Sequence, residues 1–137
     1  MSVKQFPQGT RTAGDAAAAV GCEIGQIVKS LVFIAGGRPV VALVSGSNRL
    51  DERRLGEVAG LPVIKADAEA VRSATGYAIG GVPPFGHATD VPTFMDRDLL
   101  GHPAVWAAAG RPDSVFEIAP DRLRELSSAT VADLRAG

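Results

Sequence analysis

The segment IVKSLVFIAGGRPVVALVSG, residues 27–46, holds two runs of mostly apolar residues on either side of Gly36-Gly37. β-Branched residues favour strands, and two such runs joined at a pair of glycines are typical of a β-hairpin. We therefore expect strands at residues 27–35 and 38–46. Because alternate side chains of a strand share a face, Lys29 is expected to lie beside Ile27 and Leu31 on an otherwise apolar face.

Short helices and strands are predicted on both sides of this hairpin. Capping residues, terminal glycines and Pro120 predict helices at residues 14–21, 50–60, 67–76 and 120–128. Apolar runs predict strands at residues 61–66, 91–96, 104–110 and 114–119, with a helical turn at 97–100. Strand pairs alternate with short helices, so we expect an α/β fold of the α+β type, with a mixed, mostly antiparallel sheet and helices packed against it.

Length and composition narrow the class of protein. The 137 residues suit one domain, so we expect residues 1–137 to fold as a single unit. No run approaches the roughly 18 apolar residues of a membrane span. The first residues do not resemble a secretory signal, and the one cysteine, Cys22, excludes an internal disulfide. We expect a cytoplasmic protein with no membrane partner.

The net charge of −1 limits the nucleic-acid partners that can be expected. A protein that grips many backbone phosphates usually has a strongly basic surface, and this chain does not. Any contact with nucleic acid is therefore expected to involve a short end and few phosphates.

Lys29 is the first candidate for chemistry. Its stem could simply pack in the sheet while the ammonium reaches water at the strand end. Alternatively, it could point into a pocket, where a fixed ammonium binds a phosphate, a hydroxyl or a developing oxyanion. The residues alone leave both possibilities open.

The segment GYAIGGVPPFGH, residues 76–87, is the second candidate. It combines glycines and prolines with apolar side chains, unlike an ordinary solvent loop. It could be a tight turn between elements, or a rigid pocket wall in which Gly80-Gly81 presents backbone N–H groups to a ligand. It lacks the signature of a phosphate-binding P-loop.

The remaining candidates are weaker. His87 and His102 lack the further ligands that a metal site needs, so we expect no metal and no cofactor. Asp96 and Asp98 are placed to cap a helical turn, and Cys22 suits a small buried side chain. The sequence shows no nucleophile elbow and no Ser-His-Asp spacing, so a hydrolase built on it would lack a side-chain nucleophile.

Five segments of the chain carry a resemblance to a known family: IVKSLVF, LDERRLGEVAG, TGYAIGGVPPFGH, a predicted strand ending in MD, and AAAGRPDSVFEIAPDRL. Together they resemble the YbaK/ProX family of aminoacyl-tRNA deacylases. That family is similar to the editing domain inserted in bacterial prolyl-tRNA synthetases. The resemblance covers about residues 22–134. It implies a YbaK/prolyl-tRNA synthetase-associated domain fold, a curved, barrel-like sheet surrounded by short helices.

The resemblance also implies a reaction and a site. The reaction is hydrolysis of the ester between a wrong amino acid and the 3′-terminal adenosine of tRNA. Lys29 matches the lysine thought to hold that adenosine or its phosphate, and Gly80 and Gly81 match glycines whose backbone faces the scissile carbonyl. We further expect substrate contacts from Tyr77, Pro84, Phe85, Gly86, His87, Asp96, His102 and Gly110.

Two departures from the family affect the expected specificity. Ala108 stands where many relatives carry serine, and no acidic residue is matched near Val115. The leading hypothesis is a trans-editing deacylase that removes alanine or cysteine from the acceptor end of the proline tRNA, with prolyl-tRNA synthetase as a further partner. The alternatives are a module that binds aminoacyl-tRNA or a small ligand without turnover, and a structural interaction domain. The sequence leaves the oligomeric state open.

Overall fold

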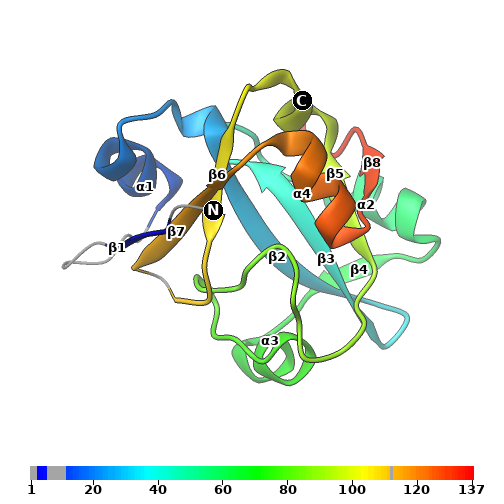
Figure 1. The fold of residues 1–137 in the computed structure, drawn as a ribbon. Helices are drawn as coiled ribbons and strands as arrows, with labels where there is room; N and C mark the ends of the chain where they lie inside the picture. Colours follow the sequence, from blue (N-terminus) through cyan, green and yellow to red (C-terminus); the bar gives the residue numbers. More distant parts are fainter. Residues whose placement is uncertain (1–2, 6–11, 112) are drawn as a thin grey trace.

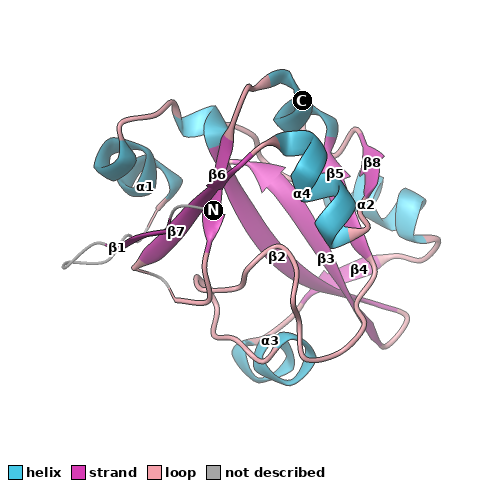
Figure 2. Cartoon of the chain, viewed as in Figure 1, coloured by secondary structure: helices cyan, strands magenta, loops and turns pink. Residues whose placement is uncertain are grey.

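A computed structural model describes residues 3–5, 12–111 and 113–137. Most of the predicted elements are present in it (Figures 1 and 2). The helices are α1 (Ala13–Val20), α2 (Glu52–Ala59), α3 (Ala68–Thr75) and α4 (Pro120–Ser127), with 3-10 turns η1 (Ile24–Gln26) and η2 (Arg97–Gly101). The strands are β1 (Val3–Gln5), β2 (Ile27–Ala35), β3 (Arg38–Ser45), β4 (Val63–Lys65), β5 (Thr93–Asp96), β6 (Val105–Ala108), β7 (Ser114–Ile118) and β8 (Thr130–Ala132).

The described strands form one mixed sheet in the order β1-β7-β6-β2-β3-β5-β8, with β4 paired to β2. The predicted hairpin is its centre, because β2 and β3 pair antiparallel along eight registered positions from Val28↔Ser45 to Ala35↔Arg38. The β1–β7, β6–β7 and β2–β4 pairs are also antiparallel, whereas β2–β6, β3–β5 and β5–β8 are parallel. Among the described residues β1 and β8 do not pair, so this curved sheet stays open.

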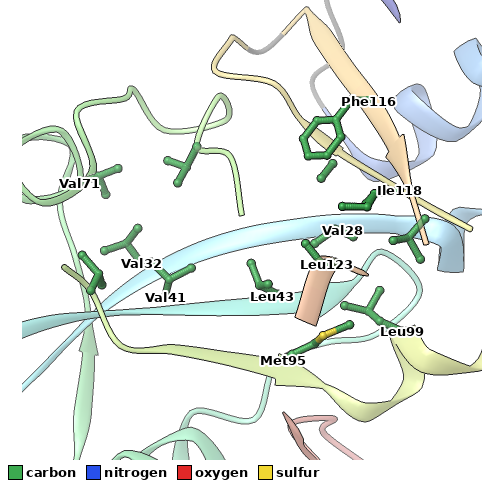
Figure 3. Close-up of a cluster of buried hydrophobic side chains, with 14 of the residues drawn as sticks. Val28, Val32, Val41, Leu43, Val71, Met95, Leu99, Phe116, Ile118 and Leu123 are labelled. Atoms are coloured by element: carbon green, nitrogen blue, oxygen red, sulfur yellow. The ribbon is translucent and has the colours of Figure 1, made fainter. Parts of the chain in front are cut away.

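The two faces of β2 contribute to different apolar clusters. Val28 and Val32 belong to the main cluster, where α3 and α4 supply Val71 and Leu123 (Figure 3). On the opposite face, Phe33 packs in a second cluster with Leu55 of α2. A third cluster on that face joins Ile27 to Trp106, Val115 and two alanines of α1. Alternation along one central strand therefore assigns helices to both faces of the sheet.

Local sequence explains where the helices begin and end. The side chains of Thr12, Asp51 and Asp67 accept hydrogen bonds from the first turns of α1, α2 and α3. Each of these helices ends at a glycine with positive φ, a conformation that glycine adopts without steric cost. In the described part of the chain, no helix has the length and apolar character needed to cross a membrane.

Candidate active site

Lys29 lies on β2, opposite Val44 of β3, on the face that carries α1 and α2. Its strand neighbours on this face are Ile27 and Leu31, which pack into separate apolar clusters. The side chain is only partly buried, and its Nζ donates a hydrogen bond to the main-chain oxygen of Asn48 at 2.7 Å. The ammonium is therefore held at a defined point beside the turn that follows β3, with donors left for a ligand.

The buried acid Asp96 holds Asn48 in position, and Asn48 in turn accepts the hydrogen bond from Lys29. Asn48 Nδ2 donates to Asp96 Oδ2 and to Asp98 Oδ2, both at 2.8 Å. Asp96 has no exposed surface and also accepts from the backbone N–H groups of Ser45 and Asp98, at 3.4 and 3.2 Å. Because β5 runs beside β3, its last residue, Asp96, meets the turn after β3. Asn48 thus joins the Lys29 ammonium to a buried carboxylate.

Two opposing effects act on the pKa of Lys29. Burial lowers the pKa from its ordinary value, because removal from water disfavours the charged form. The negative charge of Asp96 raises the pKa and partly offsets this effect. The site therefore contains an ammonium whose charge is supported by a specific acid, an arrangement more typical of functional sites than of surface lysines.

The pairing between β2 and β6 ends beside Lys29. The registered pairs are Ile27↔Trp106 and Val28↔Ala107, and the residues that follow them are Lys29 and Ala108. Beyond this point β6 continues its pairing with β7, through Ala108↔Val115. Ala108 therefore lies on the strand next to Lys29, where the β2–β6 pairing ends, and Val115 lies one strand further away, on β7.

The Gly80-Gly81 turn packs against the loop that follows β6. A Cβ at Gly81 would lie 3.1 Å from Arg111 Cα, and one at Gly110 would lie 3.1 Å from the Tyr77 ring. The Gly81 N–H donates to Ala78 O at 3.0 Å, so it is used within the turn. Within the described chain the Gly80 N–H makes no hydrogen bond, and Gly80 has a φ of 89°. Of the two amides, Gly80 is the one left available to a ligand.

The other residues of the predicted site separate into two places. His102 lies near the Lys29 network, since a Cβ at Gly25 would lie 3.2 Å from His102 Nε2 and the Gly25 oxygen accepts from Ser45 Oγ. In contrast, Phe85 packs edge-on against Phe116 in the main cluster, and His87 Nε2 lies 2.7 Å from Pro83 O. A pocket of about 650 Å³ on that side is lined by Pro84, Phe85, Gly86, His87 and the end of α4.

Asn48 is the residue that the sequence did not indicate. It contributes through a main-chain oxygen to Lys29 and through its amide to Asp96 and Asp98, and residues 45–48 looked like an ordinary turn. Asp96 and Asp98 were expected as capping residues, and Asp96 does accept from the Asp98 N–H at the start of η2. The spacing of Asp96 and Asp98, two positions apart, could have indicated that both carboxylates accept from one donor.

The described residues contain no group of three or more His, Cys, Asp or Glu side chains that could hold a metal ion. Cys22 Sγ lies 3.4 Å from Glu23 O, and burial raises the pKa of its thiol, so the reactive thiolate is disfavoured. Lys29 therefore offers the chemistry of an ammonium, and the Gly80 turn offers that of a backbone N–H donor.

Comparison with known proteins gives consistent matches over nearly the whole chain. The model of the aminoacyl-tRNA editing domain family matches residues 7–126. EbsC of Enterococcus faecalis, named "Putative Cys-tRNA(Pro)/Cys-tRNA(Cys) deacylase", is 28% identical over 125 residues, which are 90% of this chain and 76% of EbsC. A proline–tRNA ligase of Nitratidesulfovibrio vulgaris is 31% identical over 129 residues, 93% of this chain but 21% of the ligase.

A solved structure matches even more closely. It is described as the "Crystal structure of a putative trans-editing enzyme for prolyl tRNA synthetase". It is 51% identical, superposes with a TM-score of 0.95, and the match covers 99% of this chain and 87% of that one.

Proposed function

Because the chain belongs to the aminoacyl-tRNA editing domain family, we propose that it is a trans-editing deacylase for mischarged proline tRNA. Its substrate is the ester between a small wrong amino acid, alanine or cysteine, and the 3′-terminal adenosine. The observation that carries the proposal is the half-buried Lys29 ammonium, held by Asn48 and supported by the buried Asp96. The names of EbsC and of the similar solved structure, which refer to Cys-tRNA(Pro) and to prolyl-tRNA synthetase, support the same substrate class.

Lys29 and Gly80 take the two main roles in this proposal. The Lys29 ammonium binds the phosphate or a hydroxyl of the terminal adenosine and so orients the ester. Ester hydrolysis builds negative charge on the carbonyl oxygen, and a preorganised N–H donor stabilises that charge. The Gly80 amide is the free donor of the turn and serves this purpose, while the bond from Gly81 to Ala78 keeps the turn in shape.

No side-chain nucleophile is needed for this reaction. An aminoacyl ester is already activated, and positioning it beside a water molecule is sufficient for attack. With water as nucleophile, its oxygen forms the new bond to the carbonyl carbon, the bond to the ribose oxygen breaks, and that oxygen takes up a proton. The products are a free amino acid and uncharged tRNA.

The residues on β6 and β7, the strands on that side of Lys29, favour a small amino acid. Ala108 and Val115 are small or apolar and carry no group that would hydrogen-bond a polar side chain. A synthetase pocket rejects small or near-isosteric amino acids poorly, and a second site that admits only those residues corrects the error. The partners of this chain are then the tRNA acceptor end and, for access to freshly mischarged tRNA, prolyl-tRNA synthetase.

The test is deacylation of proline tRNA charged with Ala, Cys, Ser or Pro, by the wild type and by Lys29→Ala. We expect the wild type to hydrolyse the Ala or the Cys ester and to spare Pro. Lys29→Ala should lower kcat/KM by about 10²–10³-fold, the range for loss of one preorganised electrostatic contact. Lys65→Ala is the matched control, because Lys65 is an exposed lysine on β4.

Each outcome separates the proposal from its alternatives. If a folded Lys29→Ala retained full turnover, the assignment of the site would be wrong. If the wild type bound charged tRNA but hydrolysed none of the four esters, the chain would instead be a binding module. Circular dichroism of Lys29→Ala establishes that any loss of activity is not a loss of fold.

A further inference from the structure

We propose that Arg49, Arg97 and Arg135 form a phosphate-binding surface that guides the single-stranded 3′ end of tRNA to Lys29. The inference rests on the proposed function, since it identifies the surface over which that substrate arrives. The three residues come from the turn after β3, from η2 and from the C-terminal segment. All three are exposed, and contacts through Asn48 join them to the site.

Several contacts join the chain segments that carry these arginines. Asn48 Nδ2 donates to Asp98 Oδ2, and Arg135 Nη1 lies 3.4 Å from the same oxygen. Leu50 pairs with Arg135 in an antiparallel bridge, and the Ala136 N–H donates to Arg49 O at 2.8 Å. The chain from Asn48 to Leu50 is therefore linked to Arg135 both through its backbone and through Asp98.

Arg97 completes the group. It lies between Asp96 and Asp98, the two acids that both accept from the Asn48 amide. Each of the three arginines is thus adjacent to Asn48 or one contact removed from it, and the Asn48 oxygen accepts from Lys29. The three arginines therefore come from segments that meet at Asn48, the residue that holds the Lys29 ammonium.

The charge state of these arginines favours an external anion. Within the described chain, neither Arg49 nor Arg97 forms an ion pair. Arg135 makes one contact with Asp98, which leaves further donors of its guanidinium free. The neighbouring Arg53 and Arg54, by contrast, are paired with Glu57, Asp51 and Asp133. The charge of Arg97 also acts on Asp133, but no ion pair joins the two side chains within the described residues. The guanidinium donors of Arg49 and Arg97 therefore stay available to an external anion, whereas Arg53 and Arg54 on α2 are paired.

A phosphodiester strand is the ligand that fits this arrangement. Arginine binds phosphate through parallel N–H donors, and a strand supplies one phosphate per nucleotide. Three guanidinium groups agree with the small phosphate count expected from a net charge of −1. Because the terminal adenosine is proposed to lie at Lys29, the phosphates of the preceding nucleotides would pass these arginines.

The experiment measures binding of uncharged proline tRNA, so that it does not depend on turnover. Arg49→Gln/Arg97→Gln is compared with Arg38→Gln/Arg72→Gln, a control of equal charge. Arg38 and Arg72 are exposed, form no ion pair within the described residues, and lie at the far end of β3 and on α3. Within the described residues none of the four side chains forms an ion pair or a side-chain hydrogen bond, so both double variants are expected to unfold close to the wild-type temperature.

We expect the Arg49/Arg97 variant to bind tRNA with a Kd raised by about tenfold, and the control variant to bind like the wild type. The slope of log K against log salt should fall by about one and a half, since each phosphate contact on a single strand contributes about 0.7. If tRNA binding were weakened equally in both double variants, or if the wild type showed no measurable binding, the proposed phosphate-binding surface would be wrong. Weakened binding without any deacylation would support the surface and refute the proposed function.

Discussion

At the scale of single residues, Asp96 decides how far into the alkaline range Lys29 keeps its charge. Lys29 acts as an ammonium in the proposed reaction, so activity is lost as the pH rises through its pKa. Burial already lowers that pKa, and Asp96 opposes the effect. Asp96→Asn removes the negative charge while keeping the shape, so the pKa of Lys29 falls further. The alkaline loss of kcat/KM is then expected at a lower pH than in the wild type.

The control for this prediction is Asp121→Asn, because Asp121 is an exposed acid at the start of α4. Its pH profile should match that of the wild type after subtraction of spontaneous ester hydrolysis. Asp98 and its contact with Arg135 are unchanged in both variants. If Asp96→Asn reduced activity equally at every pH, Asp96 would act only by shaping the turn at Asn48.

At the scale of elements, the Gly76–His87 segment depends on a close backbone contact. A Cβ at Gly81 would lie 3.1–3.2 Å from three backbone atoms of Arg111. Backbone atoms yield less than the end of a side chain, so Gly81→Ala should force the turn away from the loop after β6. We expect a loss of about 1–3 kcal/mol in the free energy of unfolding, as for other overpacked sites, together with reduced deacylation.

Gly101→Ala provides the matched comparison for that turn. Gly101 ends η2, and a Cβ there would meet no atom within 4 Å. Its φ is not in the positive range either, so alanine should be accommodated without strain. Urea unfolding and deacylation measured on both variants separate the steric contact from the general effect of adding a methyl group. If the two variants had the same stability and the same activity, the close contact between Gly81 and Arg111 would be contradicted.

Local sequence patterns predict some of these helices and strands but not all of them. The β2–β3 hairpin and the four helices followed from local patterns, and the structure confirms them. The strands β1 and β8 were missed, because each is three residues long and, unlike the equally short β4, neither lies within a longer apolar run. Three parallel pairings were not individually predicted either, since partner choice depends on distant segments.

The sequence likewise predicts part of the candidate site, but not all of its residues. Lys29 stood out as a charge on an apolar strand face. Asn48 did not, because its role begins with a main-chain oxygen that any residue type possesses. The difference between the Gly80 and Gly81 amides is likewise a matter of backbone geometry. Composition cannot reveal which of two adjacent N–H groups is already used.

At the scale of the whole molecule, β2 couples the two faces of the sheet. Its side chains alternate between the main cluster and the two clusters on the opposite face. Loss of packing on one face should therefore release the strand from the other. We propose that the chain unfolds as one cooperative domain, and Leu43 and Trp106 allow a test, because they lie in clusters on opposite faces.

Leu43 has no exposed surface, so Leu43→Ala should cost about 2–5 kcal/mol of the roughly 5–15 kcal/mol typical of a domain. Thermal unfolding is followed by far-ultraviolet circular dichroism, which reports the whole backbone, and by fluorescence of Trp106, the single tryptophan. In one cooperative unit both signals shift to the same lower temperature. Leu126→Ala, the same change at an exposed position, should shift neither by much. If only the circular dichroism transition moved, the α1 side of the sheet would unfold independently of the main core, and the site beside Lys29 would then lie between two separately stable units.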